Sequence, residues 1–171
     1  MRWNDIDTMT CSIARTLSVV GDRWTMLIIR DVFLGIRRFE LIQRDLAMTP
    51  HRLSDRLRKL VREGILMRVK YQDRPVRFEY RLSEKGVDLY PLLVALLGWG
   101  DRWMSGSAGA PVELVHRKCG HAITPMLTCP HCKDAIVARE MSARPGPALK
   151  YRARTSGAGR RRATAGMRSS A

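Results

Sequence analysis

The sequence lacks several features that would place it in a familiar class of protein. The apolar run 92–97 is far shorter than the roughly 20 residues that a membrane-spanning helix needs. No charged segment followed by an apolar stretch marks a secretory signal. Gly-rich phosphate loops, nucleophile elbows and paired carboxylates in an apolar setting are also missing. We therefore expect a cytoplasmic protein that is not an enzyme and has no membrane partner.

Acidic residues are scarce, because 16 Asp and Glu stand against 31 Lys and Arg and leave a formal net charge of +15. The segment 144–171 contains no acidic residue, and its Gly, Ala, Ser and Arg composition is typical of disorder. The remaining chain is basic even without this segment. Such an excess favours a polyanionic partner, with nucleic acid ahead of an anionic membrane surface.

Cysteine is also sparse, with four residues, of which three lie between positions 119 and 132. A reducing cytosol argues against a disulfide framework, and clustered cysteines there more often bind metal. Together with a nearby histidine, the three cysteines form two pairs, His116 with Cys119 and Cys129 with Cys132, and two residues separate the members of each pair. This spacing suits tetrahedral zinc in a ribbon. The predicted structural Zn²⁺ ligands are His116, Cys119, Cys129 and Cys132.

Alternatives to this zinc site stay open at the level of sequence. His121 or His131 could replace His116 as the fourth ligand, and the cysteines could instead be free thiols on a loose extension. Lys133 stands where a glycine commonly follows the second pair in zinc ribbons.

Helical spacing of apolar residues marks the first part of the chain. It predicts helices over 10–20 with Thr10 as cap, from Asp22 to Gly35, and over 38–46. A further helix over 49–63 begins with Thr49 as cap and Pro50 in the first turn, where the missing N–H costs nothing. Two short helices joined by three or four residues form a helix-turn-helix.

After Gly64 the apolar period changes to two, which predicts a hairpin over 65–82 with one buried face. A helix-turn-helix followed by a hairpin is the order of a winged helix. Ser83 then caps a predicted long helix that runs to Met104. Its apolar residues cover several faces, so we expect a homodimer in which this helix and the first helix meet the partner.

The helix 49–63 separates on a helical wheel into a leucine seam and a polar face. A major groove admits one helix, whose N-terminal residues reach the base edges. We expect Arg52 to read a guanine, with His51 and Asp55 beside it and deeper cations on phosphates. A solvated face of mixed charge is the alternative. The predicted DNA contacts are Thr49, His51, Arg52, Asp55, Arg56, Arg58 and Lys59 on the helix and Lys70, Arg74 and Arg77 on the hairpin.

Four motifs in this order resemble the HxlR family of bacterial winged-helix transcription regulators. They are Cys11, GDRWT at 21–25, G-x-R-R-F at 35–39 and the LSDRLRKL-x-x-x-G helix at 53–64, and the likeness covers about 11–104. The resemblance implies a mainly α winged helix-turn-helix fold with a small β-hairpin. It also implies a DNA-binding homodimer, often a repressor, that uses the helix 49–63 for recognition and the hairpin 65–82 as wing.

Cys11 is a candidate redox-sensing residue, because in some similar regulators a cysteine at this place senses oxidants or electrophiles. We expect it in the first turn of a helix, where the dipole favours a reactive thiolate. Ser12 follows it where many family members have proline. A small packing residue is the alternative interpretation.

The leading hypothesis is a sequence-specific DNA-binding repressor at the nucleoid, with thiol or small-molecule sensing. The alternative is an RNA- or nucleoid-associated basic protein with a structural zinc site, although the aromatic-rich strands that stack RNA bases are lacking. The predicted organisation is a winged-helix DNA-binding and dimerisation domain at 1–104, a linker at 105–111, a Cys/His module at 112–138 and a disordered basic tail at 139–171.

Overall fold

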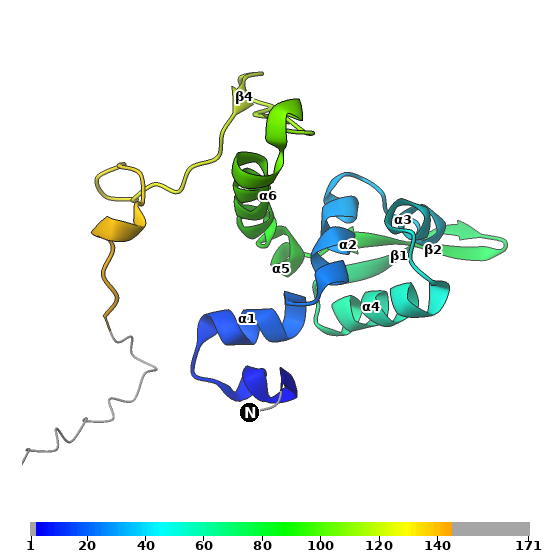
Figure 1. The fold of residues 1–171 in the computed structure, drawn as a ribbon. Coiled ribbons are helices and arrows are strands. Elements are labelled where there is room, and N and C mark those ends of the chain that lie inside the picture. The colour runs from blue at the N-terminus through cyan, green and yellow to red at the C-terminus, as the bar shows by residue number, and fades with distance from the viewer. Residues whose placement is uncertain (1–2, 145–171) are drawn as a thin grey trace, which may run out of the picture. The chain divides into compact units, whose positions relative to one another are not determined.

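A computed structural model of the protein describes residues 3–144 (Figure 1). Residues 1–2 and 145–171 lie outside the description, and so does most of the predicted basic tail. The chain divides after Met141 into two units. The first contains every helix and strand described below.

The N-terminal helices follow the predicted ranges. After the 3-10 helix η1 (Trp3–Thr8), α1 spans Ser12–Val20 and α2 spans Arg23–Phe33. Asp22 caps α2, because its Oδ1 accepts a hydrogen bond of 3.0 Å from the Trp24 N–H. The predicted Thr10 cap of α1 is wrong by one position, because Cys11 occupies the N-cap with extended backbone angles.

The helix-turn-helix consists of α3 (Phe39–Leu46) and α4 (Pro50–Arg62). Ala47 ends α3 in the left-handed conformation with φ of +49°, which turns the chain sharply toward α4. Met48 in the turn is buried. The leucine seam of α4 packs into a core with α2 and α3, whose fully buried members include Ile28, Ile29, Ile42, Leu53, Leu57 and Leu60.

The wing is an antiparallel pair of strands, β1 (Leu66–Asp73) and β2 (Val76–Leu82), with a bulge between Lys70 and Gln72. β1 contacts α4, and β2 contacts α2 and α5. The predicted buried face is only partly right. Ile65 and Leu66 at the base are both buried, whereas Met67 is exposed, because it follows Leu66 in β1 and so lies on the opposite face of the strand. Val76 is exposed because it lies next to the turn, where the hairpin extends beyond the core (Figure 1).

The predicted single helix from Ser83 to Met104 is wrong, because the structure has α5 (Glu84–Val87) and α6 (Tyr90–Met104). Pro91 lies in the first turn of α6, where it fits a new helix better than a continuing one. The predicted Ser83 cap is confirmed, since its Oγ accepts a 3.1 Å hydrogen bond from the Gly86 N–H.

Short elements follow α6. The predicted linker contains the 3-10 helix η2 (Gly106–Ala108), and the Cys/His segment contains the paired strands β3 (Leu114–Val115) and β4 (Ala122–Ile123). A third 3-10 helix, η3 (Ala138–Glu140), crosses the predicted boundary between module and tail.

Within the described part of the chain, no helix is both long enough and apolar enough to cross a membrane.

Candidate nucleic-acid interface

The first turn of α4 presents polar side chains to solvent. The His51 side chain is 85% exposed, and Arg52 beside it is exposed as well. The Arg52 side chain makes no hydrogen bond or ion pair with any residue in the range 3–144. Thr49 at the N-cap makes no side-chain capping bond, so its hydroxyl is also free for an outside partner. A flexible guanidinium and an uncapped helix N-terminus therefore share one exposed surface.

Asp55 lies between His51 and Arg58 on the same face. Its Oδ2 is 3.2 Å from His51 Nδ1, and its Oδ1 pairs with the Arg58 guanidinium. Both partners are exposed, so these pairs add little to stability. Asp55 instead restricts where His51 and Arg58 point.

Arg56 and Lys59 lie on the opposite flank of α4, against α1 and α2. Arg56 is 3.0 Å from Asp22 Oδ2, and Lys59 Nζ donates a 2.7 Å hydrogen bond to the Ser18 carbonyl oxygen. The helical wheel placed Lys59 on the outward face, but the structure has it partly buried with its Nζ directed to Ser18 of α1. These two cations hold α4 in its position.

The wing carries further exposed cations. Lys70 pairs with Asp73 at 2.7 Å. Arg74 at the turn and Arg77 on β2 are exposed and have no ionic or hydrogen-bond partner for their side chains among the described residues. Arg74 and Arg77 are therefore available to an anion.

Sequence reasoning missed two arginines that aromatic rings hold in place. The Arg68 guanidinium lies 4.0 Å from the Phe78 ring centre, and that of Arg38 lies 4.5 Å from the Tyr71 ring centre. Cation–π contacts fix the direction of a positive charge at an exposed site. The signal was the alternation of cations and aromatic residues along the hairpin.

Three charged residues, of which Asp31 is buried, connect α2 to α3 of the helix-turn-helix. Arg30 on α2 pairs with Asp31 at 2.6 Å and with Asp45 on α3 at 2.7 Å, so it ties the two helices together. The Asp31 side chain is fully buried, and its Oδ2 has no hydrogen-bond partner. Burial raises the pKa of Asp31 above its ordinary value, and the Arg30 guanidinium opposes this only in part.

Cys11 lies at the N-cap of α1, not inside its first turn, and it is half-buried with a free thiol.

Within residues 3–144, the predicted zinc ligands form two separate pairs and no group of three or more that could hold one ion. Hydrogen bonds from the backbone N–H groups of Cys132 and His131 lower the pKa of the Cys129 thiol.

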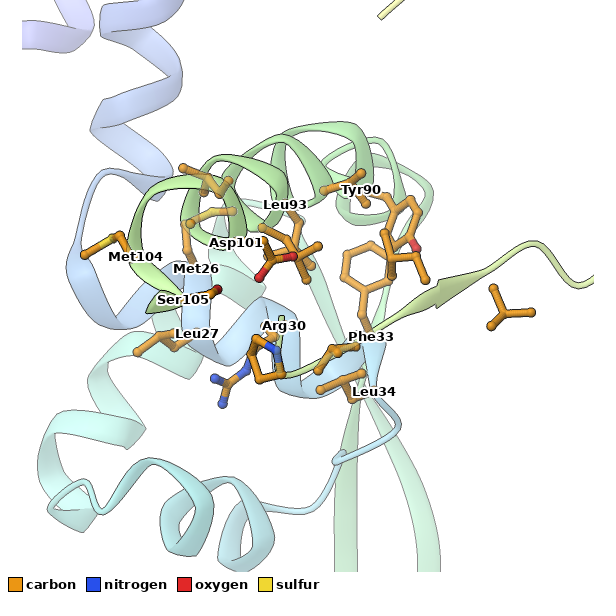
Figure 2. A pocket seen from close by; sticks show the side chains of 18 of the residues that line it. Met26, Leu27, Arg30, Phe33, Leu34, Tyr90, Leu93, Asp101, Met104 and Ser105 are labelled. Carbon is orange, nitrogen blue, oxygen red and sulfur yellow. The ribbon is translucent and has the colours of Figure 1, made fainter. Parts of the chain in front are cut away.

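An apolar cavity of about 850 Å³ lies between α2 and α6. Figure 2 shows Tyr90 and Leu93 of α6 on the side of Phe33 of α2, and the Phe33 and Tyr90 ring centres are 5.0 Å apart. The segment 109–117 contributes to the rim. The surplus of apolar residues on α6 was the sequence signal for this cavity.

Comparison with known proteins finds relatives that contain a helix-turn-helix. The family model described as HxlR-like helix-turn-helix matches residues 19–108. An uncharacterized HTH-type transcriptional regulator of Mycobacterium tuberculosis is 45% identical over 139 residues, which cover 81% of this chain and 88% of the relative.

Solved structures of transcription regulators also resemble this chain. The crystal structure of PA1607, described as a candidate transcription factor, has a TM-score of 0.74 and 33% identity, and the match covers 82% of this chain and 98% of PA1607. The redox regulator HypR in its oxidized form has a TM-score of 0.50 and 31% identity over 54% of this chain and 96% of HypR.

Proposed function

Since this chain belongs to the HxlR-like helix-turn-helix family, we propose that it represses transcription by binding duplex DNA sequence-specifically as a homodimer. The helix α4 enters the major groove, and the hairpin β1–β2 serves as the wing. The protein works at the nucleoid in the cytoplasm.

The exposed, unpaired Arg52 in the first turn of α4 is the observation that carries this proposal. N-terminal residues of a recognition helix reach the base edges, and an arginine donates two hydrogen bonds to guanine. Arg56 and Lys59 on the other flank of α4 support this role of Arg52. Their contacts with Asp22 and Ser18 hold α4 in one orientation before DNA binds.

The remaining polar groups suit the phosphate backbone. Thr49 and the free N–H groups of the first turn of α4 can hold one phosphate, and Arg58 lies further along the same face. Arg74 and Arg77 extend the positive surface onto the wing. Phosphate contacts position the protein without reading sequence.

Uncovered apolar surface supports the homodimer. The helix α6 has no buried residue, and Trp99 is 59% and Trp103 65% exposed. On α1, Ile13 is 72% exposed. Apolar surface of this extent on two helices is stabilised when a second copy covers it.

We further propose that Cys11 senses oxidants or electrophiles. The support is its half-exposed free thiol at the N-cap of α1, on a helix that the dimer would use. HypR, described as a redox regulator, is a structural neighbour. If Cys11→Ser leaves the oxidant response of DNA binding unchanged, this role is wrong.

A competition experiment separates the proposed function from an RNA- or nucleoid-binding role. The full chain is bound to labelled duplex DNA from beside its own gene and challenged with unlabelled specific duplex, random duplex and RNA. We expect the specific duplex to compete at least about 1,000-fold better than random duplex at physiological salt. Equal competition by RNA or by random duplex would contradict the proposal.

A further inference from the structure

The Cys/His segment forms two consecutive hairpin-like turns, and each holds one pair of candidate metal ligands. In the first, β3 pairs with β4, and the His116 N–H donates to the His121 carbonyl oxygen at 2.9 Å. In the second, Thr128 and Ala135 form a bridge, and the Cys129 N–H donates to the Asp134 carbonyl oxygen at 2.8 Å. The pair of ligands lies in the turn both times.

The two turns share one backbone conformation although their sequences differ. The Gly120 N–H donates to the His116 carbonyl oxygen at 2.8 Å, and the Lys133 N–H donates to the Cys129 carbonyl oxygen at 2.9 Å. Gly120 has φ of +74° and Lys133 has φ of +65°. A left-handed lysine is uncommon, so the second turn reproduces a glycine conformation without glycine. Lys133 therefore adopts the conformation that the glycine after the second pair of a zinc ribbon would have.

In the first turn, the two candidate ligands contact each other. His116 Nδ1 lies 3.3 Å from Cys119 Sγ. In the second turn, two residues separate Cys129 from Cys132, as two residues separate His116 from Cys119 in the first. All of these cysteines are free thiols.

The segment has no hydrophobic core of its own. From 109 to 141, no residue of the described chain is buried, and apolar side chains that include Val115, Ile123, Met126 and Leu127 are largely exposed. A segment below roughly 40 residues usually needs a disulfide, a metal or a partner to hold one structure. Free thiols in close pairs favour the metal.

We propose that one Zn²⁺ binds His116, Cys119, Cys129 and Cys132 and joins the two turns into a zinc ribbon. The two ligands of each pair occupy one turn, and the described residues contain no group of three or more ligands, so binding would couple coordination to the approach of the two hairpins. Each thiol releases its proton when it binds the ion. Four protein ligands leave no open coordination position, so the role is structural.

The histidine is chosen by geometry. His116 is the histidine that contacts a predicted cysteine ligand of its own turn, Cys119. His121 lies opposite it across the first hairpin, and His131 lies between the cysteines of the second turn.

The match to the M. tuberculosis relative extends over 139 of the 171 residues of this chain. A stretch of that length includes residues 112–138 wherever it begins.

The test measures zinc in the reduced full-length chain, purified without chelator, by mass spectrometry of the metal. We expect about one ion per chain, falling to about none in Cys132→Ser. Cys11→Ser is the matched control, because it removes a thiol outside the segment and should keep the full ion. Less than about a tenth of an ion in the unmodified chain, or equal loss in both variants, would overturn the proposal.

Cobalt gives a second measurement, and its first readout uses the unmodified chain. When the zinc-free chain is titrated with Co²⁺, we expect the visible bands of a tetrahedral site and a thiolate charge-transfer band, saturating at about one ion per chain. His116→Ala should weaken Co²⁺ binding at least about tenfold, whereas His121→Ala and His131→Ala should not. Octahedral cobalt without a thiolate band would contradict the site, and loss on His121→Ala or His131→Ala alone would contradict the His116 assignment.

Discussion

Arg52 and Arg56 lie about one turn apart on α4, but their surroundings differ. Arg52 is exposed and has no partner within the described chain, whereas the Arg56 side chain is 36% exposed and pairs with Asp22. The same residue type therefore has two roles on one helix. Arg52 is available to a base, and Arg56 fixes the helix to the N-cap of α2.

The first prediction compares these arginines. Arg52→Ala should reduce discrimination at one base position by about 1–3 kcal/mol and leave the free energy of unfolding unchanged. Arg56→Ala should keep base preference and lower the free energy of unfolding by at most about 1 kcal/mol, because its ion pair is partly exposed. Binding titrations on a specific site and its base-substituted versions, with urea unfolding of each variant, provide the measurement. Identical effects of the two variants would contradict the assignment.

Asp31 provides the second prediction. Burial raises its pKa above the ordinary value of 3.8, so the folded state binds this proton more tightly than the unfolded chain does. The free energy of unfolding must then fall as pH rises from 3.8 through the folded-state pKa. Asn at this position cannot titrate.

The measurement is urea unfolding of the wild type and Asp31→Asn across that pH range. We expect the stability of the wild type, relative to the variant, to decline as pH rises and then to level off. A relative stability that rises with pH would mean that the Arg30 ion pair, and not burial, controls Asp31.

At the scale of elements, α5 packs closely against the base of the wing. A Cβ added to Gly86 would lie 2.3 Å from the Ile65 carbonyl oxygen and 2.9 Å from Leu82 Cδ2. Ile65 directly precedes β1, and Leu82 is the last residue of β2. The Ile65 oxygen belongs to the backbone, so it cannot rotate away from an added Cβ. This contact fixes where the wing leaves the core.

The third prediction is that Gly86→Ala destabilises the fold by about 1–3 kcal/mol through overpacking, although alanine favours a helix. Gly98→Ala on α6 is the matched control, since nothing lies within 4 Å of its added Cβ. It should be neutral or stabilising by at most about 1 kcal/mol. Urea unfolding compares them, and equal stability changes would show that the close approach at Gly86 is unimportant.

The sequence predicted the elements better than their ends. The leucine seam of α4 and the period of two in the hairpin are strong signals, since each follows from which face meets the core. The break before α6 was missed because apolar residues continue across it, although Pro91 was the available sign. The exposed wing tip was missed because alternation cannot tell how far a hairpin extends beyond its core.

In the candidate DNA interface too, the sequence predicted some residues correctly and missed the contacts of others. Arg52 and the wing arginines were predicted from periodicity and charge, and the structure leaves them exposed. The contacts of Arg56 with Asp22 and of Lys59 with Ser18 depend on how α1 and α2 pack against α4. A helical wheel treats a helix alone, so it cannot contain this tertiary information.

At the scale of the whole molecule, the exposed apolar surface of α6 carries the fourth prediction. Trp99→Asp should place an unpaired charge in the proposed dimer interface and raise the dimer Kd at least about 30-fold. Leu41→Asp is the control, since Leu41 is 42% exposed on α3, away from α1 and α6. Sedimentation over a concentration series measures both. An unchanged dimer in Trp99→Asp, or a monomeric wild type, would contradict the interface.

Selection of bound fragments from random duplex DNA tests the central claim most directly, because it reports recognition, symmetry and the role of α4 together. The wild-type chain should enrich one motif with two half-sites whose centres are about 10 base pairs apart, as two recognition helices in successive major grooves require. Arg52→Ala should enrich the same motif with one position in each half-site relaxed. Failure of the wild type to enrich any sequence, or an identical motif from Arg52→Ala, would contradict the account.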